Sequence, residues 1–183
     1  TMIPTKEFLI LLRGLKDEGI TSNAFHRNLV QTMLAQAEGL MERGVEQCNM
    51  SSIHEFLERS AEGEQGFLDV VRQELPHLTA IIQTLKASGD ALSTPSSDLQ
   101  NAVERVAQLW SAAQQVNASH AMLFFMGLHS FLTIVTQHRV VVGATRYNAI
   151  QARLDQSLVG IEKWADNGRM ERMAIQRVLP CAP

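Results

Sequence analysis

Apolar residues recur at steps of three and four over most of this 183-residue chain, and this spacing limits the fold more than any other feature. The longest regular series runs from Leu68 to Leu85, where a heptad-like pattern is typical of a helix that packs lengthwise on a neighbour. Strand-type alternation does not persist for more than a few residues. The sequence therefore predicts an all-α protein, an antiparallel helical bundle of about six or seven helices.

The expected helix boundaries follow from capping and breaking residues. The apolar stripe of the second helix extends to Cys48. A third helix begins near Ser52 and contains Pro76, where it is expected to bend unless a new helix begins there. Asn167 and Gly168 predict the end of the penultimate helix, so that a separate last helix would span 170–179. The boundary between the two helical halves is expected in the Gly-, Ser- and Pro-containing segment 89–96.

The segment from Ser119 to Val142 contains no Asp, Glu or Lys, and it carries the longest apolar run of the chain, Ala121 to Val135. This run has 15 residues, fewer than the roughly 20 needed to cross a bilayer. We therefore expect the most heavily buried helix of the bundle here, and no membrane association.

Composition and length predict one ordinary globular domain. Apolar residues make up 45% of the chain and charged residues 19%, values that exclude wholesale disorder. We expect a single helical domain over 1–183, with helical halves 4–88 and 97–179 joined by the loop 89–96. Two cysteines are too few for a disulfide framework, and no signal sequence is visible, so a cytoplasmic protein of bacterial type is predicted.

The charges are distributed unevenly along the chain. The net charge is −3, but from Arg139 onward Lys and Arg exceed Asp and Glu by three, which leaves −6 for the preceding residues. Halves of opposite charge can pair with each other, and this interpretation is favoured over an anion site or a nucleic-acid site.

Motifs for metal binding and catalysis are sparse. Glu74 and His77 form an E-x-x-H pair, the spacing used by di-metal helical bundles, but no second pair accompanies them. They are weak metal candidates, and no metal or cofactor is predicted. The chain also has no glycine-rich phosphate loop and no recognisable nucleophile motif, which argues against an enzyme.

Arg139, Arg146 and Arg153 are spaced by seven residues and would share one helix face. Guanidinium groups suit carboxylates, phosphates and other oxyanions, so these three residues, with His138 beside them, are the candidate ligand-binding residues. The alternative is a solvated or internally paired face. Both interpretations remain open at this point.

Gln137, His138 and Arg139 lie at the end of an apolar helix and are followed by a glycine-containing break and an amphipathic helix. With this pattern, residues 137–164 resemble bacterial nitrate- and nitrite-sensing helical domains. In that family the pattern is Q-x-x-R-G, and the resemblance implies that Arg139 contacts an oxyanion.

Taken together, these features predict a non-enzymatic cytoplasmic regulatory or protein-interaction bundle. Its expected partner is a second copy of the chain or another helical protein. The alternative is a sensor of a small anion or apolar molecule with Arg139 at the site, and a third possibility is a metal- or haem-binding bundle.

Overall fold

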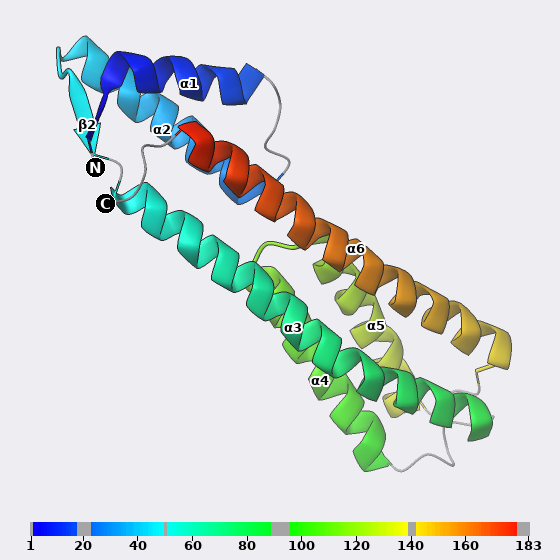
Figure 1. The fold of residues 1–183 in the computed structure, drawn as a ribbon. Helices are drawn as coiled ribbons and strands as arrows, with labels where there is room; N and C mark the ends of the chain where they lie inside the picture. The colour runs from blue at the N-terminus through cyan, green and yellow to red at the C-terminus, as the bar shows by residue number, and fades with distance from the viewer. Residues whose placement is uncertain (1, 18–22, 50, 89–95, 139–141, 179–183) are drawn as a thin grey trace. The chain divides into compact units, whose positions relative to one another are not determined.

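The computed structural model describes residues 2–17, 23–49, 51–88, 96–138 and 142–178 (Figure 1). These residues form six helices and two short strands, which confirms the predicted all-α helical bundle. The elements are, in chain order, β1 (Met2–Pro4), α1 (Thr5–Asp17), α2 (Ala24–Glu42), β2 (Gln47–Asn49), α3 (Ser51–Ser88), α4 (Ser96–Gln115), α5 (Ser119–His138) and α6 (Ala144–Val178).

The chain forms two compact units. One consists of Thr1–Glu64 with Ala165–Pro183, and the other of Gln65–Trp164. Helices α3 and α6 supply residues to both units, because both boundaries fall inside these two helices. The predicted single domain over 1–183 stays a prediction. The expected linker 89–96 lies, except for Ser96, outside the described residues.

The first unit is organised around the buried faces of α1 and α2. Its core also includes Ile3 of β1 and Cys48 of β2, because the two strands pair antiparallel with these residues opposite each other. The prediction that Cys48 belongs to a helical stripe was wrong, because Cys48 lies in β2. Strands of three residues are too short for alternation to show in the sequence.

Helix α2 ends at Glu42 because of a glycine two residues later. Gly44 has φ 72°, and its N–H donates to the Met41 carbonyl at 3.1 Å while the Val45 N–H donates to the Leu40 carbonyl at 2.9 Å. This is the Schellman arrangement, in which a left-handed residue stops the helix and satisfies its last carbonyl groups.

Helix α6 continues through Gly168 to Val178, so the predicted break at Asn167 and Gly168 was wrong. Gly168 is buried and faces the carboxylate of Glu64, which leaves no room for a Cβ atom. The glycine therefore permits a close approach within the helix instead of ending it. Helix α3 likewise runs through Pro76 without a new helix beginning there.

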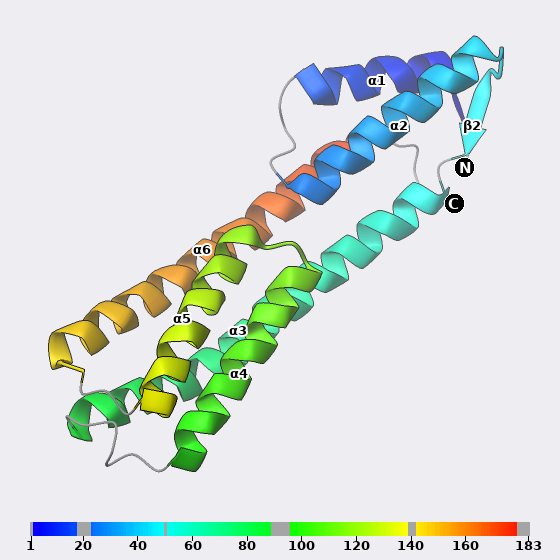
Figure 2. The same ribbon diagram turned by 180° about the vertical axis from the view of Figure 1, so that it is seen from behind.

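The second unit combines parts of α3 and α6 with the whole of α4 and α5. Helices α4 and α5 pack side by side and are joined by a tight turn (Figure 2). Asn117 at this turn has φ 55°, and its N–H donates to the Gln114 carbonyl while that of Ala118 donates to the Ala113 carbonyl. Asparagine tolerates the left-handed conformation, so the same Schellman geometry ends α4 here. Helix α5 then begins at Ser119, directly after Ala118.

Helix α5 is buried on one face only, and the prediction that it is the most heavily buried helix was wrong. The span Ser119–Gln137 is long and apolar enough, with mean hydropathy 1.3, to cross a membrane by length and composition alone, and 28% of it is buried. Leu123 and Ile134 are 56% and 52% exposed, and Met126 is also exposed. A helix that is apolar all round gives no polar face to identify its outer side.

Candidate functional site

A pocket of about 340 Å³ lies between α5 and α6 within the second unit. Its volume is at the lower end of the range for small-molecule sites, about 300–1,000 Å³. One wall consists of residues at the start of α5, namely Ala118, Ser119, His120, Ala121 and Phe124. The other wall consists of α6 residues, namely Arg153, Gln156, Ser157, Gly160, Ile161 and Trp164. We refer to this cavity as the α5/α6 pocket.

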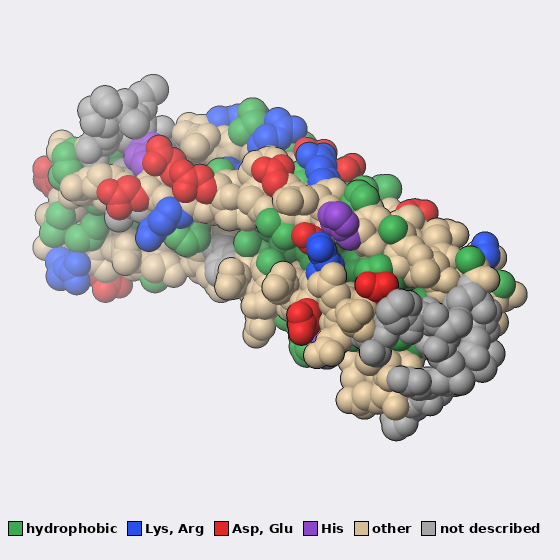
Figure 3. All heavy atoms as spheres, turned by 90° about the horizontal axis from the view of Figure 1, so that it is seen from below, with side chains coloured by type: hydrophobic (Ala, Val, Ile, Leu, Met, Phe, Trp, Pro, Cys, Tyr) green, Lys and Arg blue, Asp and Glu red, His purple; other side chains and the backbone are tan. Residues whose placement is uncertain are grey.

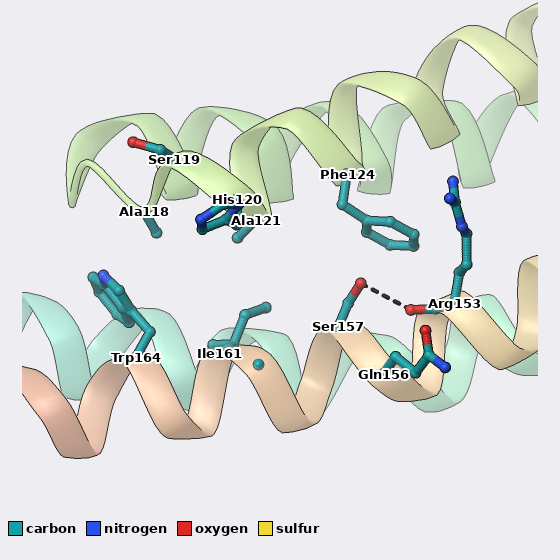
Figure 4. A pocket seen from close by; sticks show the side chains of 11 residues that line it. Ala118, Ser119, His120, Ala121, Phe124, Arg153, Gln156, Ser157, Ile161 and Trp164 are labelled. Carbon is teal, nitrogen blue, oxygen red and sulfur yellow. Dashed lines mark hydrogen bonds between the residues drawn. The ribbon is translucent and has the colours of Figure 1, made fainter.

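The pocket has an apolar floor and polar groups at its rim. Ala118, Ala121 and Ile161 are buried, whereas His120 and Arg153 are exposed. In Figure 4, Phe124 extends from α5 toward α6, and Trp164 lies at the opposite end of the pocket from Arg153. An apolar cavity with a few polar groups is the usual form of a small-molecule site.

Local sequence explains both walls. The turn at Asn117 places Ala118 directly before α5, and its carbonyl accepts from the Met122 N–H at 2.9 Å, so α5 starts at the pocket. On α6, Gly160 has open space where a Cβ atom would stand, so the missing side chain leaves part of the pocket empty. Ser157 donates its hydroxyl to the Arg153 carbonyl at 2.8 Å, which ties this side chain to its own helix.

The ring of Trp164 is positioned from a third helix. It makes an edge-to-face contact with Phe67 of α3, with ring centroids 5.8 Å apart and planes at 89°. Such contacts fix the orientation of an aromatic side chain beyond what burial alone provides. The apolar end of the α5/α6 pocket is therefore preorganised.

Two other hollows are weaker candidates. One, of about 250 Å³ in the first unit, is lined by residues that include Phe8 and Cys48. Another, of about 660 Å³, runs along residues 167–177 of α6 alone and is therefore one face of a helix. The α5/α6 pocket lies between two helices and combines buried apolar residues with a cationic side chain.

The predicted arginine stripe is only partly described. Arg153 lines the α5/α6 pocket, whereas Arg146 is exposed two helical turns away and is not part of the lining. Arg139 and the side chain of His138 lie outside the described residues. The assignment of a ligand to these residues remains a prediction, to which the structure adds the pocket beside Arg153.

The weak metal candidates do not form a joint site in the described part of the chain. Glu74 accepts from Arg105 at 2.6 Å, and His77 is exposed. Among the residues that the structure describes, no three His, Cys, Asp or Glu side chains gather closely enough to hold a metal ion. His129 of α5 is half-buried, and its ring lies beside that of Trp110 with the centroids 5.7 Å apart.

A buried polar network lies in the first unit and was not foreseen from the sequence. His26 of α2 is fully buried, with Nδ1 2.9 Å from a carboxylate oxygen of Glu171 and Nε2 3.1 Å from the hydroxyl of Ser60. Both carboxylate oxygens of Glu171 also accept from the Asn23 N–H at 3.0 Å. Glu171 therefore joins α6 to the start of α2 and to His26.

Ser60, His26 and Glu171 contact one another in the same succession as the serine, histidine and carboxylate of a catalytic triad. Their surroundings, however, favour a structural role. Ser60 lies inside α3, where backbone N–H groups are engaged in the helix and cannot form an oxyanion hole. His26 is completely shielded from solvent, and none of the three hollows described above includes Ser60 or His26. The network satisfies buried polar groups and fixes the register of three helices.

A buried ion pair lies one helical turn away from this network along α3. Arg172 of α6 is 2.6 Å from a carboxylate oxygen of Glu64, and the two side chains are 10% and 6% exposed. The Glu64 carboxylate rests against Gly168. The charges could not have been paired from the sequence, because the two residues are more than a hundred positions apart.

One ionisable group in the second unit has a perturbed pKa. Tyr147, the single tyrosine of the chain, is buried and contacts Phe131 edge-to-face. Desolvation by burial raises its pKa above the ordinary value. This side chain belongs to the core and does not line the α5/α6 pocket.

Comparison of the chain with protein-family models, with curated proteins and with solved structures gave no match. The resemblance of residues 137–164 to nitrate- and nitrite-sensing domains therefore stays a prediction. On the face shown in Figure 3, Lys and Arg side chains lie among acidic ones and do not form a continuous basic patch.

Proposed function

We propose that this protein is a non-enzymatic helical sensor that binds a small molecule in the α5/α6 pocket. The observation that carries the proposal is the pocket itself, an apolar cavity of about 340 Å³ bordered by His120, Arg153 and Gln156. This is the ligand-sensor alternative of the sequence analysis, with Arg153 in place of Arg139 as the residue at the site.

The chemistry of the pocket supports binding without catalysis. The Ser157 hydroxyl is engaged with a backbone carbonyl of its own helix, so no base activates it. The remaining lining is mostly aliphatic, aromatic or amide, which suits recognition of an apolar body. A cytoplasmic regulatory protein that responds to a metabolite is consistent with this arrangement.

The proposal is tested with N-phenyl-1-naphthylamine, a neutral probe whose fluorescence rises in apolar surroundings. At about −0.3 kcal/mol per non-hydrogen atom, a probe of about 17 such atoms binds with a Kd of about 0.2 mM or tighter. Gly160→Leu places a side chain in the pocket and improves helix propensity, so it is expected to abolish binding without lowering stability.

The matched control is Gly66→Leu. Gly66 lies in α3, is exposed and has open space around it, but it does not line the pocket. The control variant is expected to bind the probe as the unmodified protein does. Probe binding that survives in Gly160→Leu, or no binding at all, would contradict the proposed function.

The exposed face of α5 favours a second function, association with a second copy of the chain. Three exposed apolar residues are three and eight positions apart along α5, which places them on one side of the helix: Leu123, Met126 and Ile134. Exposed apolar patches of this kind are typical of protein contacts. Light scattering tests it: a dimer that dissociates in the double variant Leu123→Gln/Ile134→Gln supports this function, and a monomer at high concentration argues against it.

A further inference from the structure

We infer that the ligand of the α5/α6 pocket is an elongated apolar molecule with a single anionic group, held with the anion at Arg153 and the apolar body toward Trp164. The inference rests on the proposed function, since it specifies the chemical class of the ligand. It follows from the charges around the pocket, from the position of the aromatic residues and from the distance between the two ends.

The charges around the pocket are one-sided. Arg153 contributes a permanent positive charge, and the lining contains no Asp or Glu. Within the described part of the chain, no carboxylate forms an ion pair with Arg153. The two acidic residues nearest to the pocket along α6 have other partners, since Asp155 accepts from Gln151 at 3.0 Å and Glu162 pairs with Arg72 at 3.4 Å.

The start of α5 adds to the same electrostatic bias. Ala118 precedes the helix and has no side-chain oxygen to cap its first N–H groups. The positive end of the helix dipole therefore also borders the cavity. An anion is stabilised in such surroundings, whereas a cation would be repelled and would find no counter-charge in the lining.

The opposite end of the pocket accommodates an apolar body. Trp164 is held by Phe67, and Ile161 lies one turn closer to Arg153 with its side chain buried. Arg153 and Trp164 are separated by eleven helical residues, which corresponds to about 16 Å along α6. A molecule that contacts both ends must be elongated, with its charge at one end.

A matched pair of probes tests this orientation. 8-Anilinonaphthalene-1-sulfonate has the same ring system as N-phenyl-1-naphthylamine and adds one sulfonate. We expect Arg153→Gln to weaken binding of the sulfonate about tenfold, which corresponds to about 1.4 kcal/mol. Binding of the neutral probe is expected to weaken much less than binding of the sulfonate, because glutamine keeps part of the aliphatic side chain and removes the charge.

Two further variants distinguish the effect of the Arg153 charge from an effect of net charge. Arg153→Lys retains the charge and is expected to restore most of the sulfonate affinity. Arg146→Gln removes an exposed charge of the same helix outside the pocket and is expected to have little effect. An equal loss in Arg146→Gln would show a general effect of net charge and would overturn the assignment to Arg153.

Failure of the inference is distinguishable from failure of the proposed function. If Gly160→Leu abolishes binding of the neutral probe but Arg153→Gln leaves sulfonate affinity unchanged, the pocket binds ligands and the inference is wrong. If neither probe binds the unmodified protein, the proposed function itself is wrong.

Competition experiments separate an acyl ligand from an aromatic one. Decanoate and 1-naphthoate are compared with their neutral amides as competitors of the bound sulfonate probe. Stronger displacement by either acid than by its amide supports the inference, and the more effective acid identifies the ligand type. Equal displacement by acid and amide in both pairs would contradict it.

Discussion

Replacement of Gly168 by alanine is expected to destabilise the protein, although the same change in an exposed helix usually stabilises it. A Cβ atom at this position would lie 2.6 Å from Oε2 and 2.7 Å from Cδ of Glu64, and closer still to Oε1. The Glu64 carboxylate cannot simply move aside, because it is buried and paired with Arg172 at 2.6 Å.

The magnitude follows from two opposing contributions. Removing a glycine from a helix interior stabilises it by about 0.5–1 kcal/mol. Overpacking costs about 1–3 kcal/mol, and the upper end is expected here because the Glu64 carboxylate must shift against its buried partner Arg172. We therefore expect Gly168→Ala to lower the free energy of unfolding by about 2 kcal/mol, which lowers the melting temperature by about 4–8 °C.

Thermal unfolding followed by circular dichroism measures the effect, and Gly160→Ala is the matched control. Gly160 lies in the same helix with open space around it, so its alanine variant is expected to raise the melting temperature by about 1–4 °C. In a Glu64→Ala background, Gly168→Ala should become neutral or stabilising, because the clashing carboxylate is gone. If Gly168→Ala stabilises the otherwise unmodified protein as Gly160→Ala does, the close packing of Glu64 on α6 is refuted.

Three further predictions concern buried and exposed groups. Glu171→Ala should cost about 2–5 kcal/mol in chemical denaturation, because it removes the carboxylate that contacts Nδ1 of the buried His26 and accepts from the Asn23 N–H. Glu162→Ala removes an exposed ion pair and should cost about 0–1 kcal/mol, so similar values for the two variants would contradict the network. Tyr147 has a raised pKa in the folded state, so the unfolded chain loses this proton first as the pH rises. The free energy of unfolding should therefore fall above a pH of about 10. Titration of tyrosinate absorbance in the native protein should give a raised pKa, and an ordinary pKa would contradict the prediction. Leu123→Gln combined with Ile134→Gln should change the melting temperature of the monomer by less than about 2 °C, since both side chains are largely exposed, and a large loss would show that they pack in the core.

The sequence predicted the helices well because long apolar periodicity is a local property. The stripe from Leu68 to Leu85 is buried as expected, and α4 ends at Gln115, just before the left-handed Asn117. The wrong prediction of a break at Gly168 arose because a glycine can have two roles in or near a helix. Gly44 ends a helix through its left-handed conformation, whereas Gly168 remains helical and admits a neighbouring carboxylate.

The outer face of α5 could not be predicted because the helix has no charged residue to mark it. Leu123 and Phe125 are equally apolar in the sequence, yet one is 56% exposed and the other is completely buried. Which of them faces the core depends on the position of α4, and that position is fixed by the turn at Asn117.

The candidate site was predicted in part. Arg153 was selected from its spacing along a helix, which is a local feature, but the opposite wall of the pocket comes from residues about thirty positions earlier in the chain. The network of His26 and Glu171 escaped detection for the same reason, since 145 residues separate its two members. Single histidines and glutamates on amphipathic helices carry no signal of such pairing.

The location of bound ligand is the most direct test of the proposed sensor function. Backbone amide resonances of isotope-labelled protein are compared by nuclear magnetic resonance with and without N-phenyl-1-naphthylamine. The proposal predicts shifts concentrated in residues 118–124 and 153–164, which form the two walls of the α5/α6 pocket. Shifts concentrated instead around Cys48 or along residues 167–177, with none in the two walls, would contradict it.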